Sequence, residues 1–540
     1  MRKFRNIDYE DPHWFSNGVN MIDCDPDFAL RVLSRNLSSR EDILSSVGRY
    51  FDAMFKNSKV TDMSFAVFQQ ISFVETESMD FIYRKLANMD ERGELDRDGR
   101  WSYYKERAPR LYRAFKEFDL DWAEVAISEC RVRGVRPWLY FRMNDLHAVD
   151  SDESIFHDSF FFKAKENGWL IGNETYGHPL GTSGSIHNLY DFSHAEVREW
   201  LLTYLDEIIM RYDVFGYELD FMRNIYCFDY LRAEPGYQEY MNDFIRRVRD
   251  IITRAEEKFG HDIKLAVRLG HSVENNFVYG FDVKTWIKEG LVDALIPSCE
   301  EVCNSGTDVR EWRRVIGDDV ALFIGYDSHV IRWLVCEAEC IHAMEEKHIK
   351  AFAARYFNLG ANGVYFNNYY AVRSFSTGTG PEAADYTIES CAKDIDREYA
   401  ESGLRTLVVT HEDIVPIGCK GYKPLPIRLD RGKATITLNI GKVREGEHFY
   451  VTVGYDRAEF EMIQVSLGEL SPVSCTVIPV VPDKVEGHYY DEKWNFLESA
   501  VLVRYEFDGF SSDGDFDVVF DGENIGVVYL EVTATPDELK

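Results

Sequence analysis

The chain has 540 residues, with 93 Asp or Glu against 61 Lys or Arg, and its formal net charge at pH 7 is −32. This excess of negative charge argues against a nucleic acid as partner, because a polyanion is bound by basic surface. A hydrophobic fraction of 45% and an aromatic fraction of 14% are typical of a folded globular protein rather than a disordered one.

The first eight residues reach Asp8 before any apolar stretch as long as that of a signal peptide. No window approaches the roughly 18 consecutive apolar residues of a membrane span. We therefore expect a cytoplasmic protein that does not bind membranes. The ten cysteines are scattered, which favours reduced thiols over a disulfide framework, and their spacing fits no zinc motif. We expect neither a metal nor a cofactor.

Between about residues 60 and 370, short β-branched or aromatic runs alternate with longer stretches of helical period. This alternation predicts repeated βα units around a parallel sheet. The expected strands are residues 3–8, 63–70, 136–145, 214–220, 264–270, 291–298, 320–327 and 363–368. Eight such strands close a (β/α)8 TIM barrel, the fold class that we predict.

The helix expected over residues 193–212 illustrates the intervening segments. Val197, Leu201 and Leu205 recur at helical intervals. Ser193 is the expected N-cap, with Glu196 three residues later. The segment 244–259 repeats the pattern.

After about residue 415 the pattern changes to short alternating strands, expected at 434–440, 448–453, 500–505 and 525–532. It predicts a C-terminal all-β sandwich. We divide the chain into a catalytic barrel, residues 1–415, and a β-sandwich with a structural role, residues 416–540, joined by a linker near 418–426. The acidic run 507–521 lacks the spacing of a calcium loop and is expected to be a solvated turn.

The reactive groups of such a barrel project from the C-terminal ends of its strands. Glu218 and Asp220 stand two residues apart on one expected strand, so both side chains leave the same face, whereas Tyr217 faces the helices. Two carboxylates this close repel each other, which tends to raise the pKa of one and leave the other ionised. The pair predicts acid–base chemistry. In the alternative interpretation, one carboxylate is merely ion-paired to Arg223 or Arg268.

Other strand ends carry further candidates. Glu301 is the expected proton donor, although the adjacent Glu300 cannot point inward at the same time. Aromatic residues such as Trp138 and Tyr140 suit stacking on sugar rings. The expected substrate-binding residues are Arg142, Asn144, Asp145, His147, Arg223, Arg268, Glu300, Asp327, Asn367 and Asn368. For Asp145 and Asn368, capping of the adjacent loops is an equally good interpretation.

Four segments resemble a group of glycoside hydrolases, largely defined by sequence, that combine a (β/α)8 barrel with a C-terminal β-sandwich. They are residues 136–145 (RPWLYFRMND), 212–224 (YDVFGYELDFMRN), 264–272 (KLAVRLGHS) and 280–298 (GFDVKTWIKEGLVDALIPS). The fourth strand of that group reads close to DGIELDFMR, and here Phe215-Gly216 replaces its Asp-Gly. The resemblance covers roughly residues 60–370. It implies glycosidic-bond hydrolysis with Glu218 and Asp220 as the acidic positions and Arg223 as the following arginine, without assigning the acid or the sugar.

We therefore expect a glycosidase acting on a small glycoside or oligosaccharide. One alternative is a metal-assisted barrel hydrolase or lyase that uses Asp145, Glu218, Asp220 and His271 as ligands. Another is a sugar-binding barrel protein without turnover. The expected partner is a carbohydrate, and the sequence leaves open whether the chain forms a homo-oligomer.

Overall fold

The structure is a computed structural model. It describes the chain except for residues 1–6, 17, 26–27, 56–57, 99–100, 146–153, 173–185, 223, 300–302, 327–328, 336–337, 344, 368–394, 410–418, 431, 479–498 and 540. Within this described part, no helix combines the length and apolar character needed to cross a lipid bilayer.

Eight strands form a closed barrel in the order β1-β10-β7-β6-β5-β4-β3-β2, which confirms the predicted (β/α)8 fold. Every neighbouring pair whose register is known is parallel. The barrel strands are β1 (Val19–Cys24), β2 (Asp62–Gln69), β3 (Arg136–Arg142), β4 (Gly216–Asp220), β5 (Lys264–Gly270), β6 (Ala294–Ser298), β7 (Ala321–Tyr326) and β10 (Gly363–Phe366).

The predicted first strand, residues 3–8, is wrong. The barrel begins with β1, while Ile7 and Asp8 are not in a strand and residues 3–6 lie outside the described residues. The other seven predicted strands each overlap a barrel strand. The hydrophobicity pattern does not predict β1, because Asn20 and Asp23 interrupt its apolar residues. All six residues of the strand are nevertheless buried.

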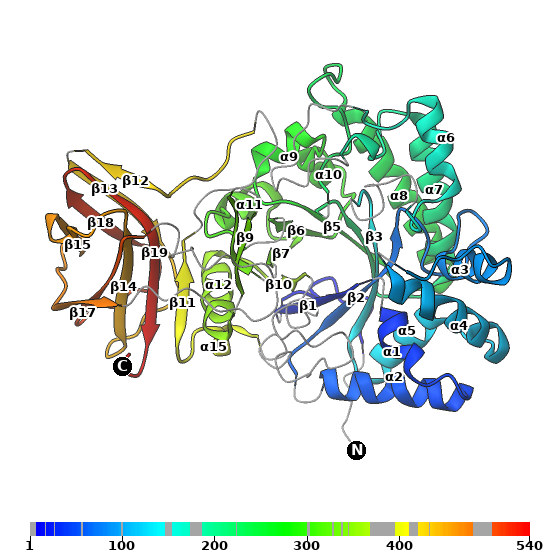
Figure 1. The fold of residues 1–540 in the computed structure, drawn as a ribbon, viewed down its shortest axis with the longest axis horizontal. Coiled ribbons are helices and arrows are strands. Elements are labelled where there is room, and N and C mark those ends of the chain that lie inside the picture. Colours follow the sequence, from blue (N-terminus) through cyan, green and yellow to red (C-terminus); the bar gives the residue numbers. More distant parts are fainter. Residues whose placement is uncertain are drawn as a thin grey trace. The chain divides into compact units, whose positions relative to one another are not determined.

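Helices surround the strands in the barrel part of the chain (Figure 1). They are α1 (Phe28–Val32), α2 (Arg40–Phe55), α3 (Ile82–Glu91), α4 (Ser102–Phe118), α5 (Trp122–Val132), α6 (Ser159–Asn167), α7 (Ala195–Arg211), α8 (Gln238–Phe259), α9 (Val273–Tyr279), α10 (Val283–Lys288), α11 (Val309–Ile316), α12 (Glu346–Leu359) and α15 (Arg397–Ala400), with short 3-10 turns at Leu33–Arg35 and Ile186–Asn188. The helix expected over 193–212 is α7, but its N-cap is His194 and not Ser193. The segment 244–259 lies within α8.

Aromatic and charged side chains pack in the interior of the barrel near the N-terminal ends of the strands. Trp138 is fully buried and donates its indole N–H to Asp62, 2.8 Å away, which also binds Arg136 at 2.6 and 2.8 Å. Gly216 makes room for this indole, because a Cβ there would lie 2.2 Å from the Trp138 ring. Ionic groups at this end of a barrel usually stabilise the fold.

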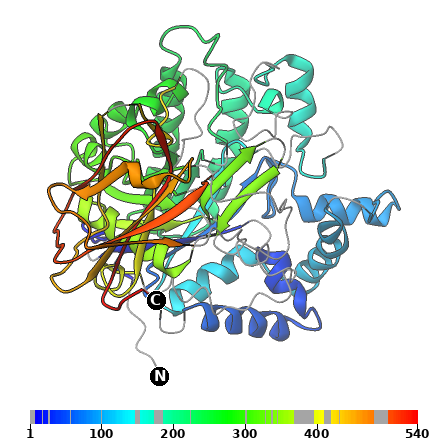
Figure 2. The same ribbon diagram turned by 60° about the vertical axis from the view of Figure 1, so that its left-hand side comes forward.

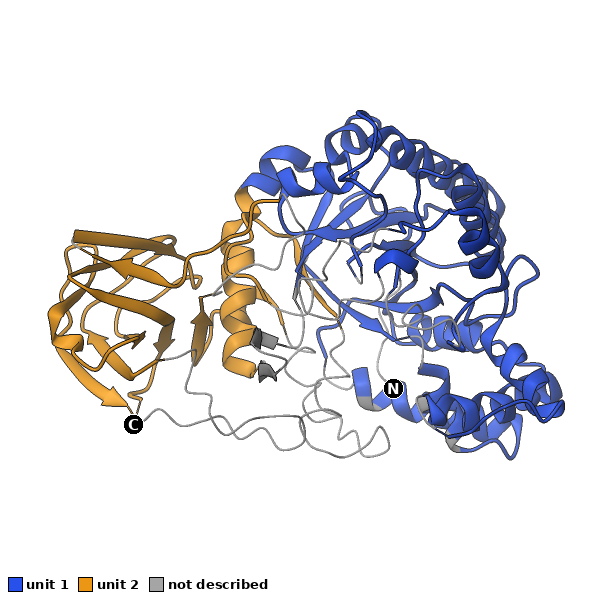
Figure 3. Ribbon diagram, turned by 45° about the horizontal axis from the view of Figure 1, so that its top comes forward, with its two compact units in different colours: residues 1–300, 311–325 blue, residues 301–310, 326–540 orange. Residues whose placement is uncertain are grey.

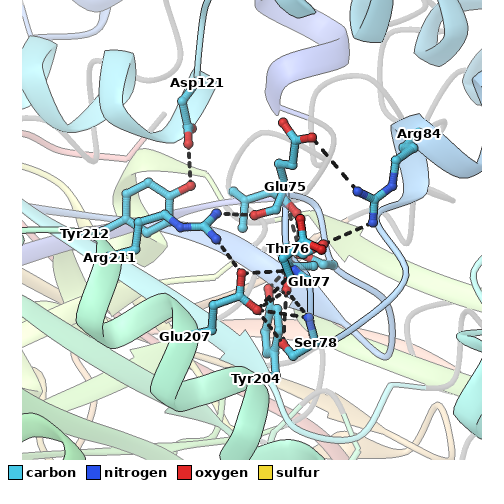
Figure 4. A network of polar contacts seen from close by, with 12 residues as sticks. Glu75, Thr76, Glu77, Ser78, Arg84, Asp121, Tyr204, Glu207, Arg211 and Tyr212 are labelled. Carbon is cyan, nitrogen blue, oxygen red and sulfur yellow. Dashed lines mark hydrogen bonds and ion pairs between the residues drawn. The ribbon is translucent and has the colours of Figure 1, made fainter.

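The segment that follows β2 is fastened to α7 by a polar network (Figure 4). Glu207 accepts hydrogen bonds from the hydroxyls of Thr76 and Ser78 at 2.6 and 2.7 Å. Arg211 donates to the same carboxylate and to the carbonyl of Glu75. This network gives the loop after β2 a defined course over the outer helix.

The chain divides into two compact units, residues 1–300 with 311–325 and residues 301–310 with 326–540 (Figure 3). The second unit contains a two-stranded hairpin, β8 (His329–Val335) with β9 (Ala338–Ala343), that the sequence pattern did not predict. It also contains two C-terminal antiparallel sheets, which form the predicted β-sandwich (Figure 2). Their strands are β11 (Arg405–Val408), β12 (Ile427–Leu429), β14 (His448–Tyr455), β16 (Ser474–Ile478), β17 (Val501–Phe507) and β19 (Ile525–Thr535) in one sheet, and β13 (Gly432–Leu438), β15 (Ile463–Leu467) and β18 (Phe516–Gly522) in the other.

Aromatic side chains join the two sheets, since the ring of Phe449 on β14 lies 5.3 Å from that of Phe516 on β18. The expected alternation holds in β13, where Ile436 and Leu438 are buried and Thr435 and Thr437 are exposed. The acidic run 507–521 is not a turn throughout, because β18 occupies its second half with alternating burial. The boundary at residue 416 stays a prediction, although β11 precedes it and already pairs with β19.

Candidate active site

Four polar residues, three of them charged, occupy one row across four neighbouring strands near their C-terminal ends. In register, Gln69 of β2 lies beside Arg142 of β3, Arg142 beside Asp220 of β4, and Asp220 beside Arg268 of β5. All are buried, and neighbouring residues in register on parallel strands face the same side of the sheet. Burying charge in a barrel is costly unless each group is paired, so this row is a candidate site rather than ordinary core.

Asp220 is the last residue of β4 and is fully buried. Its two carboxylate oxygens accept from one guanidinium nitrogen of Arg268 at 3.2 and 3.3 Å, and one of them also accepts from the backbone N–H of Met222 at 2.8 Å. Arg268 in turn donates to the hydroxyl of Ser298 at 3.2 Å. These contacts hold the carboxylate of Asp220 in one orientation at the strand end.

Glu218 lies two residues deeper on the same strand, on the same inward face, as the two-residue spacing predicted. It is fully buried and accepts from the hydroxyl of Ser64, the central inward residue of β2, at 2.8 Å. Tyr217 faces outward as expected and donates to the carbonyl of Tyr212 at 2.6 Å. Both acidic positions therefore belong to the interior of the barrel.

A second acidic pair, Asp23 and Asp25, lies at the end of β1 and was not among the residues predicted from the sequence. Arg142 donates to Asp25 and lies 3.6 Å from Asp145. Asp23 is fully buried, and the hydroxyl of Tyr140 lies 3.5 Å from its carboxylate. These residues extend the cluster from β3 to β1.

The surroundings of Asp23 raise the pKa of its carboxyl. Burial raises the pKa of its carboxyl well above the ordinary value, and the negative charges of Asp25 and Glu218 act in the same direction. Arg142 and Arg268 oppose this shift without cancelling it. A raised pKa favours the protonated carboxyl, which is the form that a general acid needs. The signal in the sequence was Asp23-Cys24-Asp25, which repeats the two-residue spacing of Glu218 and Asp220.

Asn144 follows β3, and its side chain is directed at backbone groups. Its amide N–H groups donate to the carbonyls of Tyr190 and Tyr226 at 3.1 and 2.8 Å, and its oxygen accepts from the N–H of Tyr190 at 3.2 Å. This arrangement favours positioning of the surrounding loops over direct contact with a ligand. Asp145 is fully buried next to Arg142, and Asn367 is buried just after β10.

Several predicted site residues cannot be placed. Those outside the described residues are His147, Arg223, Glu300, Glu301, Asp327 and Asn368. Trp138 and Tyr140, which were expected to stack on a sugar, are both buried, and their polar atoms lie within hydrogen-bond distance of Asp62 and Asp23. In the described part of the chain, no group of three or more His, Cys, Asp or Glu side chains is arranged as a metal site.

No protein-family model and no curated protein matches this sequence. Solved structures with partial similarity include the α-L-fucosidase isoenzyme 2 of Paenibacillus thiaminolyticus, with a TM-score of 0.41 and 13% identity over 71% of this chain and 49% of that one. The glycoside hydrolase domain of PgaB from Bordetella bronchiseptica has a TM-score of 0.39 and 11% identity over 66% of this chain and 98% of that one. The chain thus spans about half the length of the fucosidase. At these TM-scores and identities, the structural similarities carry no information about activity. A functional proposal therefore has to be based on the row of buried charges at the strand ends.

Proposed function

We propose that the protein hydrolyses a glycosidic bond in a small glycoside or oligosaccharide. The observation that supports this is the buried cluster of Asp23, Arg142, Glu218, Asp220 and Arg268 at the C-terminal half of the barrel strands. It combines a carboxylate that is paired with an arginine and a carboxyl whose pKa is raised well above its ordinary value. Glycoside hydrolysis needs these two forms of one functional group on either side of the bond.

In this proposal Asp220 faces the anomeric carbon, where positive charge develops in the transition state. Its negative charge stabilises that centre, either by forming a bond to it or by removing a proton from the attacking water. The leaving-group oxygen takes a proton from an acid, and water supplies the hydroxyl of the product. Glu301 remains the donor expected from the sequence, and Asp23 is the described carboxyl best suited to the same step.

A panel of aryl glycosides, varied in sugar and anomeric configuration, tests the activity directly. We expect release of the phenol from one class of glycoside, and the rate should not change with a chelator, because the proposed steps use carboxyl groups alone. Loss of activity with the chelator would instead support the metal-assisted alternative. Binding of a sugar without turnover would support the non-catalytic one, and neither result is compatible with our proposal.

The variant Asp23→Asn tests the buried acid through both activity and stability. The folded protein keeps the proton of Asp23 at a pH where the unfolded chain loses it, because the folded pKa is raised. Stability contributed by this group therefore falls as the pH rises above about 4, the ordinary pKa of Asp. Asn cannot ionise, so we expect a higher Tm at pH 7 and a weaker decline from pH 4 to pH 7. If Asp23 donates the proton, hydrolysis should fall about 10²–10⁴-fold.

Asp121→Asn is the matched control. Asp121 is also a buried carboxyl whose pKa is raised by burial, but it caps α5 and accepts from the hydroxyl of Tyr212 at 2.5 Å (Figure 4). Its variant should leave hydrolysis unchanged. A variant of Asp23 that hydrolyses at the wild-type rate would remove Asp23 from the mechanism and leave the donor to Glu301.

A further inference from the structure

Strand β2 contains a β-bulge that redirects its C-terminal end. Ala66 pairs with Tyr140 of β3, but the next pair in register is Phe68 with Phe141, so Val67 is the extra residue. A bulge of one residue reverses which side chains face each side of the sheet beyond it. Bulges are frequent beside active sites for this reason.

The bulge places a glutamine inside the barrel where simple alternation would place a phenylalanine. Counting in steps of two from the inward Ser64 puts Phe68 and Gln70 inside. In the structure Phe68 instead packs against Tyr204 of α7, with ring centroids 5.3 Å apart, and Gln69 pairs with the inward Arg142. Gln69 is only 6% exposed, yet its side chain hydrogen bonds to no described residue.

Gln70 adds a second carboxamide at the same strand end. It is 1% exposed and has a φ of +57°, in the left-handed region that residues other than glycine rarely adopt. Its amide N–H donates to the oxygen of Asn144 at 3.3 Å. The contacts of Asn144 with the backbone of Tyr190 and Tyr226 fix which of its atoms is that oxygen. The carbonyl oxygen of Gln70 consequently has no hydrogen-bond partner in the described structure.

Contacts outside the barrel hold this unusual backbone in place. The hydroxyl of Tyr204 donates to the carbonyl of the bulged Val67 at 2.8 Å, and the N–H of Phe73 donates to the same carbonyl at 2.9 Å. The Glu207 network fastens the loop a few residues further on (Figure 4). Backbone strain that is held by so many contacts is typical of functional positions.

We propose that Gln69 and Gln70 form a hydroxyl-binding pair that selects the substrate. This inference rests on the proposed glycosidase function. A sugar hydroxyl both donates and accepts, and a carboxamide offers a complementary acceptor and donor without charge. Gln69 lies two strands from Asp220 in the same row, about 10 Å away at the spacing of parallel strands, which is within the reach of a sugar held at Asp220.

The variants Gln69→Met and Gln70→Met remove the polar groups and keep the length of the side chain. Met at position 70 meets the same backbone strain as Gln, so the comparison isolates the carboxamide. The measurement is kcat/KM for the best aryl glycoside and for its monodeoxy analogues, each lacking one hydroxyl. Gln464→Met is the matched control, since Gln464 is exposed on β15 in the C-terminal sandwich.

We expect wild type to hydrolyse one or two of the deoxy glycosides about 10–100-fold more slowly than the parent, the range for a lost buried hydrogen bond. The kcat/KM of the Met variants for the parent glycoside should fall by a similar factor. These variants should then hydrolyse the parent glycoside and those deoxy analogues equally fast. The control should retain the wild-type ratios. Binding of the same glycosides, measured by calorimetry on Asp220→Asn, should show the same pattern.

If both Met variants keep the wild-type ratio for every deoxy glycoside while Asp220→Asn is inactive, the hydroxyl-binding pair is refuted and the glycosidase stands. If wild type binds the glycosides without hydrolysing them, the proposed activity is refuted. The ratios of binding affinity for parent and deoxy glycosides, measured by calorimetry, then decide whether Gln69 and Gln70 bind a hydroxyl. If it neither binds nor hydrolyses any of them, both proposals are refuted.

Discussion

Asp220→Asn is expected to leave the protein folded and to slow glycoside hydrolysis by about 10³-fold or more, the effect of removing a charge that stabilises the transition state. Asn has the same size and can still accept the hydrogen bond from the N–H of Met222. It lacks the negative charge that pairs with Arg268 and that, in the proposed function, faces the developing positive centre. The measurements are kcat on the best aryl glycoside and a thermal unfolding curve by circular dichroism.

Glu218→Gln should also slow turnover by several orders of magnitude if the two carboxylates act together. Its hydrogen bond from Ser64 is available to a glutamine oxygen, so the fold should persist. Asp293→Asn is the matched control, because Asp293 accepts from Arg249 at 2.5 Å and precedes β6 at the N-terminal end of the barrel. If the Asp220 and Glu218 variants both hydrolyse the glycoside at a rate within about tenfold of wild type, the assignment of the active site to β4 is wrong. Removing even one group that stabilises transition-state charge typically lowers the rate by more than this.

The sequence predicted the barrel well where strands consist of uninterrupted apolar and aromatic residues. β5 begins and ends at the predicted residues, and β3 begins at the predicted one. β1 was missed because Asn20 and Asp23 interrupt its apolar residues, and Asp23, which lies beside the inward Ser64, belongs to the candidate site. A strand that contributes charge to a buried site therefore weakens the hydrophobic signal by which strands are recognised.

The orientation of Gln69 could not be predicted from the sequence. A period of two residues is the only information that a strand offers locally, and it assigns Phe68 to the interior. The bulge at Val67 depends on the hydroxyl of Tyr204, more than a hundred residues later in the chain. The same holds for Asn144, whose partners Tyr190 and Tyr226 become neighbours only when the loops are folded.

The C-terminal sandwich is expected to be indispensable for folding, and expression of residues 1–415 alone should yield insoluble or unfolded protein. β11 would remain in this fragment without its partner β19, with which it pairs from Arg405 to Val408. Arg405 is fully buried and binds both carboxylate oxygens of Glu447 at 2.8 and 2.9 Å. The truncation therefore removes the ion pair of Arg405 together with the strand that pairs with β11.

The same truncation uncovers α12, the helix that leads into the last barrel strand, β10. Gly441 packs so closely on α12 that an added Cβ would lie 2.6 Å from the Cβ of Ala354. Asn439 donates to the side chain of Asn358 on the same helix at 2.9 Å. Ten of the 14 residues of α12 are buried, and the contacts with Gly441 and Asn439 show that the sandwich covers part of this helix.

The experiment compares the solubility and unfolding curves of residues 1–415, expressed alone and together with residues 416–540 as a separate chain. Co-expression should restore soluble protein and hydrolysis, because the lost contacts of Arg405 and α12 can form between two chains. A soluble, fully active fragment 1–415 would contradict the structural role, since β11 and Arg405 would then be stable without the sheet and the carboxylate that contact them here. Soluble fragment with weakened substrate affinity alone would instead indicate that the sandwich binds carbohydrate, because its loss would affect the ligand and not the fold.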